Sequence, residues 1–220
     1  MINKCFALLL LFVISMAGAK GKLPVNAVER KERFPLLAVI ESENIELYGV
    51  NPYGYVLYQN GRGTYFEWPG LTPRGIAPEM KYFDFDGDGE KELAVILYVA
   101  SGTGFALMDL HILTIDQSED LKPVYTDFAL RGGEAQSWLP KDLTVITDKL
   151  QEPSEKIGFG DIVYFEFEGD TIQTTIAIGL WHEGWRVLDF VGEVQAEVTF
   201  EGKEFALKNY TFTLYEDENN

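Results

Sequence analysis

The densest group of chemically useful side chains in this sequence lies in residues 83–93, which read FDFDGDGEKEL. Asp84, Asp86 and Asp88 occupy every second position, and Glu92 follows four residues after the last of them. Carboxylates this close repel one another, and a bound cation removes that repulsion. Calcium takes about six to eight oxygen ligands, and a short loop supplies several of them from its first, third and fifth positions. The spacing therefore predicts a calcium site.

The later positions of the loop fit the same chemistry. Gly89, at the sixth position, allows a sharp turn, and Glu90, at the seventh, offers its backbone carbonyl. Glu92, at the ninth, is predicted to bind directly or through water. An EF-hand needs a glutamate at the twelfth position, which here is Val95, in an apolar segment that predicts a buried strand. The predicted ligands, outside an EF-hand, are Asp84, Asp86, Asp88, Glu90 and Glu92.

An acidic loop of this kind that runs straight into an apolar strand resembles the calcium loops of FG-GAP and VCBS-type repeats, the integrin-like loops of extracellular β-proteins. The matching residues are Asp84, Asp86, Asp88, Gly89, Glu92 and Leu93. The likeness runs from Lys81 to Ile115 and includes the glycine-rich connection SGTG at residues 101–104. More loosely, the chain looks like uncharacterised secreted bacterial VCBS-repeat-containing proteins. That group has no assigned activity, so the resemblance implies a calcium loop and no mechanism.

The resemblance does not extend to the propeller that FG-GAP repeats normally build. Propellers usually have about four to eight blades, and this sequence has one good loop. Residues 165–174, FEFEGDTIQT, echo the spacing but lack the second glycine and the final acid, so we predict a hairpin there. We expect a single integrin-like loop and not a full propeller.

The elements that must position this loop are predicted to be strands. Hydrophobic residues alternate with polar ones in DIVYFEF, VQAEVTF and YTFTLY, a period typical of half-buried antiparallel strands. Shorter strands are expected at residues 36–41, 44–50 and 54–59, and turns are expected at 168–170 and 201–203. No long segment has helical periodicity. We predict an all-β fold, an antiparallel meander forming a sandwich or irregular barrel, as a single domain over residues 34–216.

The N-terminus predicts export. Lys4 precedes the apolar run CFALLLLFVISM, and Ala17-Gly18-Ala19 is a small-x-small cleavage sequence, so residues 1–19 are predicted to be a signal peptide. The run is too short to span a bilayer, which needs about 20 residues. Residues 20–33 are expected to form a polar leader and residues 217–220 an acidic tail. The expected location is secreted or periplasmic, with no membrane span after cleavage.

Composition narrows the classes of partner. The net charge is −17, and such a surface repels nucleic acid and anionic membranes and attracts cations. The single cysteine, Cys5, lies in the predicted signal peptide, so the exported chain would have no disulfide. An aromatic content of 14% argues against disorder.

Three further residues are candidate ligand contacts. They are His111, Trp181 and Trp185. Exposed aromatic residues beside polar groups stack on sugars or anchor partners, although packing within a hairpin is the alternative. The histidines have no cysteine partners in the exported chain, so a zinc site of the usual type is not expected.

Two functions remain open from the sequence. The first is a calcium-binding β-domain that serves as a binding or structural module at the cell surface or in the periplasm, with a glycan or protein partner. The second is a secreted hydrolase that uses paired carboxylates about 5–9 Å apart. The sequence contains no HExxH, GxSxG or P-loop pattern, so we predict no catalytic residues.

Overall fold

The computed structural model describes residues 34–50, 54–69, 75–117, 123–138, 144–185, 188–201 and 203–215. The predicted signal peptide, the polar leader and the acidic tail lie outside these residues. Within them, no helix is long and apolar enough to cross a membrane.

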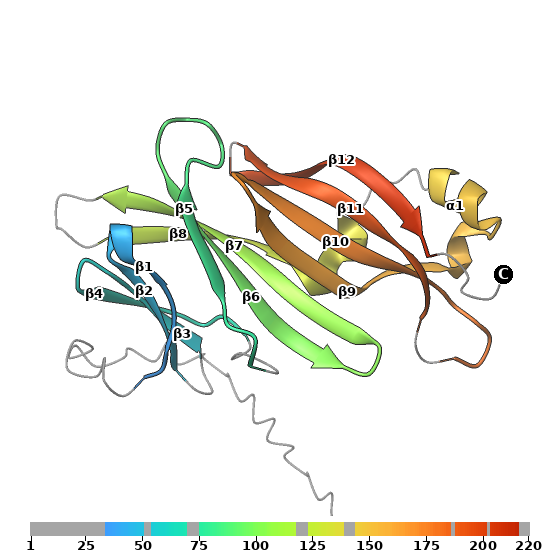
Figure 1. Cartoon of the computed structure of the whole chain (residues 1–220), viewed down its shortest axis with the longest axis horizontal. Coiled ribbons are helices and arrows are strands. Elements are labelled where there is room, and N and C mark those ends of the chain that lie inside the picture. The colour runs from blue at the N-terminus through green and yellow to red at the C-terminus, as the bar shows by residue number, and fades with distance from the viewer. Residues whose placement is uncertain are drawn as a thin grey trace, which may run out of the picture.

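The fold is built almost entirely from strands in two sheets, as predicted (Figure 1). The four-stranded sheet has the order β1-β2-β3-β4. Its strands are β1 (Leu36–Ile40), β2 (Ile45–Val50), β3 (Gly54–Gln59) and β4 (Arg62–Phe66). A 3-10 turn, η2 (Glu41–Glu43), joins the first two.

The eight-stranded sheet has the order β12-β11-β10-β9-β7-β6-β5, and β8 also pairs with β7. Its first strands are β5 (Glu79–Phe83), β6 (Glu92–Gly102), β7 (Phe105–Gln117) and β8 (Pro123–Arg131). The others are β9 (Ile157–Glu168), β10 (Thr171–Leu180), β11 (Asp189–Glu201) and β12 (Glu204–Leu214). Between β8 and β9 lie η4 (Gly132–Ser137), α1 (Thr144–Leu150) and η5 (Ser154–Lys156).

The second half of the chain forms the predicted antiparallel meander. In β9, Val163 and Phe165 are buried while Tyr164 and Glu166 are exposed, which confirms the period-two pattern. The turn at 168–170 also forms, because Glu168 pairs with Thr171. The turn predicted at 201–203 includes residue 202, which lies outside the described residues, and Glu201 pairs with Glu204 on either side of it. The sheet is open and does not close into a barrel.

The large sheet forks at β7, which the sequence did not predict. One edge of β7 pairs with β6; the other pairs with β8 along Asp109 to Gln117 and, in parallel, with β9 at Ala106 and Leu107. The fork lets the β9–β12 meander turn away from β6–β8 and pack back over it through a shared core. That core includes Ala94, Leu110, Val163, Ile176 and Val194.

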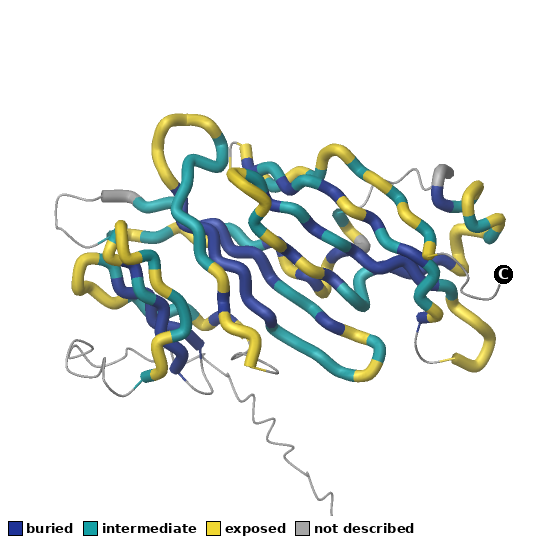
Figure 2. Tube along the Cα trace, viewed as in Figure 1, coloured by how far each residue is buried: buried dark blue, intermediate teal, exposed yellow. Residues whose placement is uncertain are grey.

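A second core fills the space between the four-stranded sheet and the other face of β6 and β7. It includes Leu47, Leu57, Trp68, Val95 and Leu113. Strand β6 is therefore buried on both faces from Glu92 to Tyr98, and Figure 2 shows the first part of the strand in dark blue. This explains why ELAVILYV is a nearly continuous apolar run instead of an alternating one.

Candidate metal centre

The acidic loop connects β5 to β6 and stands at the end of this hairpin (Figure 1). Phe83 and Glu92 are paired at its base. Phe85 packs against the first core, and its ring lies edge-on to Phe83 with 5.4 Å between centroids. The alternating phenylalanines thus anchor the loop to the body of the protein.

The three aspartates of the loop converge. Asp84, Asp86 and Asp88 each offer a carboxylate oxygen, and these oxygens lie within 4.8 Å of one another. Two oxygens that bind the same calcium ion at about 2.3–2.6 Å are at most about 4.6–5.2 Å apart. The separation in the loop is therefore compatible with ligands of one cation. Across the described residues, this is the one group of three or more acidic, histidine or cysteine side chains with that property.

Backbone amides hold the aspartates in place. Asp84 accepts hydrogen bonds from the amides of Gly87 at 2.7 Å and Gly89 at 3.1 Å. The Asp86 carboxylate accepts a hydrogen bond from the backbone amide of Asp88 at 3.1 Å, and the Asp88 carboxylate accepts one from the backbone amide of Glu90 at 2.7 Å. These donors offset part of the repulsion among the carboxylates.

Two glycines make this geometry accessible. Gly87 and Gly89 have φ angles of 77° and 93°, in a region that favours glycine because a Cβ is strained there. The sharp turn predicted at Gly89 is present.

Glu92 and Glu90 are placed differently from the aspartates. Glu92 is 3% exposed, and its Oε2 accepts a hydrogen bond from the amide of Phe85 at 2.8 Å. Glu90 is exposed, and neither glutamate belongs to the converging group. Burial raises the pKa of the Glu92 carboxyl; the Phe85 amide opposes this shift, and the three aspartates add to it.

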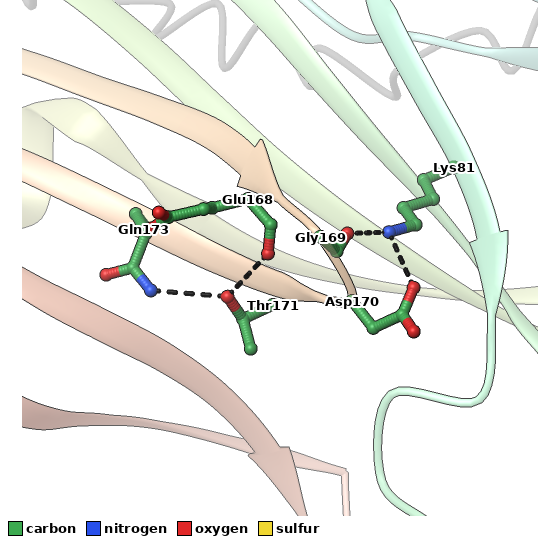
Figure 3. A network of polar contacts seen from close by, with 6 residues as sticks. All are labelled: Lys81, Glu168, Gly169, Asp170, Thr171 and Gln173. Atoms are coloured by element: carbon green, nitrogen blue, oxygen red, sulfur yellow. Dashed lines mark hydrogen bonds and ion pairs between the residues drawn. The ribbon is translucent and has the colours of Figure 1, made fainter.

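A lysine on β5 fixes the strand that leads into the loop. The Lys81 ammonium donates to the Gly169 carbonyl and to Asp170 Oδ1, 3.0 Å away, in the β9–β10 turn (Figure 3). In the same turn, Thr171 Oγ1 donates to the Glu168 carbonyl at 2.8 Å. The interaction ties β5, at one end of the sheet, to the meander. Sequence reasoning missed it because no local pattern relates residues so far apart.

The other predicted contacts do not lie together. His111 is 2% exposed on β7, with Nδ1 2.9 Å from Asp127 Oδ1 and its ring 4.5 Å from that of Trp68. Trp68 Nε1 donates to Asp127 Oδ2 at 2.7 Å. Trp181 and Trp185, in contrast, are exposed in the connection between β10 and β11. The structure thus places His111 inside the second core and both tryptophans at the surface.

The buried carboxylates among the described residues are Glu92 and Asp109. Asp109 accepts a hydrogen bond from the Gly132 amide at 3.0 Å. It is paired with Leu97, which lies five residues after Glu92, so the two acids are roughly 16 Å apart along the strands. This exceeds the spacing of about 5–9 Å that glycoside hydrolysis requires.

Comparison with known proteins adds no relative. No protein-family model matches the chain, and no curated protein and no solved structure matches it.

Proposed function

We propose that this chain is a secreted calcium-binding β-domain that acts as a binding or structural module at the cell surface or in the periplasm. The observation that carries the proposal is the convergence of Asp84, Asp86 and Asp88 within 4.8 Å. Three carboxylates at that separation are an oxygen donor set suited to a hard cation.

The role of each residue in the proposal follows from its position. The three aspartates bind calcium through side-chain oxygens, and the Glu90 carbonyl adds a ligand. Glu92 holds the start of the loop in place, because its carboxylate accepts a hydrogen bond from the Phe85 amide at 2.8 Å. Glu92 also completes the coordination shell of the calcium ion, either through a water molecule or after a small shift of its carboxylate.

The ion is expected to stabilise the domain and not to be required for folding. Extracellular modules typically bind calcium with dissociation constants of about 10⁻⁴–10⁻³ M. At ten times that concentration the stabilisation is about RT ln 11, or roughly 1.4 kcal/mol. That is small beside a typical free energy of unfolding of about 5–15 kcal/mol.

Thermal unfolding of chelator-treated protein tests the proposal. Millimolar calcium should raise Tm by about 2–4 °C per kcal/mol of stabilisation. Magnesium should have a smaller effect, because it demands a tight octahedron and retains its waters. An unchanged Tm with calcium would contradict calcium binding, and an N-terminal sequence that retains Met1 in a membrane fraction would contradict export of a cleaved chain.

A further inference from the structure

The connection between β10 and β11 exposes two large aromatic side chains. Trp181 is 43% exposed and Trp185 is 56% exposed, whereas tryptophan is on average highly buried in folded proteins. Figure 2 shows this segment as the exposed loop at the lower right. The acidic loop between β5 and β6 lies well away from this segment, at the upper left in Figure 1, so the two features are spatially separate.

Trp181 and Leu188 pack over a pair of glycines, which we call the glycine seat: Gly158 lies against both side chains and Gly179 lies against Leu188. Gly158 on β9 and Gly179 on β10 are register partners. A Cβ at Gly158 would lie 2.7 Å from Trp181 Nε1 and 2.5 Å from Leu188 Cδ2, and one at Gly179 would lie 2.6 Å from Leu188 Cβ. The Trp181 amide also donates to the Lys156 carbonyl at 2.8 Å. The indole is therefore fixed against the sheet while much of its surface faces solvent.

Trp185 stands beside an exposed polar pair. Its ring packs against that of His182 with 4.9 Å between centroids, and its amide donates to the His182 carbonyl at 3.1 Å. His182 Nε2 lies 3.0 Å from Asp189 Oδ2, and both side chains are about half exposed. Leu188, which is buried, anchors the end of the loop just before Asp189.

We propose that this loop, defined by Trp181, His182, Trp185 and Asp189, binds a neutral oligosaccharide. A sugar ring presents an apolar C–H face and a rim of hydroxyl groups. The indoles offer flat apolar surfaces, and the imidazole and carboxylate offer hydrogen-bonding partners for hydroxyls. The net charge of −17 disfavours an anionic glycan.

The glycine seat supports recognition as well as packing. A side chain already fixed in its bound orientation loses less conformational freedom when a ligand binds. The inference names the ligand class of the binding module proposed above and rests on that proposal for its cellular setting. It uses none of the predicted calcium ligands.

The test is calorimetric titration of the calcium-saturated protein with three neutral hexasaccharides: cellohexaose, maltohexaose and chitohexaose. We expect at least one to bind with a dissociation constant of about 1 mM or tighter. Trp181→Ala and Trp185→Ala should each weaken binding about tenfold or more. Gly158→Ala, which keeps both indoles but crowds the seat, should cause a smaller loss. Tyr164→Ala is the matched control, since Tyr164 is 39% exposed on the outer face of β9, and it should bind like the unaltered protein.

Two results would overturn the inference. One is no heat with any of the three sugars at about 10 mM. The other is equal affinity of both tryptophan variants and the unaltered protein. Binding to neutral phosphatidylcholine vesicles without sugar binding would identify the loop as a membrane contact instead. Asp86→Ala separates this test from the calcium proposal, because it should remove the calcium response and leave sugar affinity unchanged.

Discussion

Glu92 accepts a hydrogen bond from the backbone amide of Phe85, with 2.8 Å between Oε2 and N. The bond joins the first residue of β6 to the second residue of the acidic loop. Since Phe85 also packs against the first core, the position of the aspartates is tied to the interior of the protein. The bond places a buried carboxylate beside three further acids, an arrangement that a cation would stabilise.

Glu92→Gln separates the structural role of this residue from its charge. The amide oxygen of glutamine still accepts from Phe85, while the buried charge is removed. We expect the calcium-free variant to be more stable than the unaltered protein by on the order of 1 kcal/mol and to respond less to calcium. Urea unfolding with and without chelator measures both effects.

Glu92→Ala provides the comparison for that variant. It leaves the Phe85 amide without its acceptor, which should lower stability by about 1–3 kcal/mol with or without calcium. If Glu92→Gln destabilised the calcium-free protein as much as Glu92→Ala does, the buried charge of Glu92 would not be what lowers the stability of the calcium-free protein.

Asp86→Ala should abolish the calcium-dependent rise in Tm. Its carboxylate belongs to the converging group, and its Oδ1 accepts only from the Asp88 amide among the bonds of the loop. Glu90→Ala is the matched control, because Glu90 is proposed to contribute its backbone carbonyl alone. Differential scanning calorimetry in millimolar calcium compares the two variants. Loss of the calcium response in both, or in neither, would refute the ligand assignment.

These predictions draw on the part of the structure that the sequence predicted best. The alternation of Val163 and Phe165 with Tyr164 identified a half-buried strand, and the apolar run after Glu92 identified a buried one. Both patterns are local, since they follow from which face of a strand is covered. The same holds for Gly89, whose positive φ angle follows from the turn.

What the sequence did not predict depends on contacts between distant segments. Strand β8, in which Val124 is 52% exposed and Leu130 is buried, has no clean alternation, so its pairing with β7 was not anticipated. The parallel contact of Leu107 with Val163 and the link from Lys81 to Asp170 join segments far apart in the chain. Such pairings are decided by the packing of whole layers and not by periodicity.

Asp109→Asn tests the effect of a buried carboxylate far from the acidic loop. Burial raises the pKa of Asp109, opposed by the Gly132 amide and by the neighbouring His111 and Arg131, while Glu134 adds to the rise. The stabilisation linked to its proton is thus complete below the ordinary pKa of about 3.9 and is lost as pH rises through the higher folded value. Asparagine does not undergo this loss.

The variant should therefore gain stability relative to the unaltered protein, by on the order of 1 kcal/mol, between pH 4 and pH 7. Urea unfolding at a series of pH values measures the difference. A difference that does not change with pH, or that favours aspartate at pH 7 more than at pH 4, would be inconsistent with a raised pKa.

Trp68→Phe tests the second core. Trp68 Nε1 donates to Asp127 Oδ2 at 2.7 Å, and its ring stacks on Phe66 with 4.3 Å between centroids. Phenylalanine lacks the donor, so we expect a loss of about 1.5–3 kcal/mol, typical of a hydrogen bond to a charged group. Trp185→Phe, at a position that is 56% exposed, should change stability by less than about 0.5 kcal/mol. Equal effects in urea unfolding would exclude a structural role for the Asp127 contact.

Calorimetric titration of calcium into chelator-treated protein tests the central claim most directly. We predict one ion per chain, bound with a dissociation constant of about 10⁻⁴–10⁻³ M, and no measurable heat with Asp86→Ala. Absence of heat from the unaltered protein in millimolar calcium, or identical binding by Asp86→Ala, would contradict the account and leave the loop as an acidic turn.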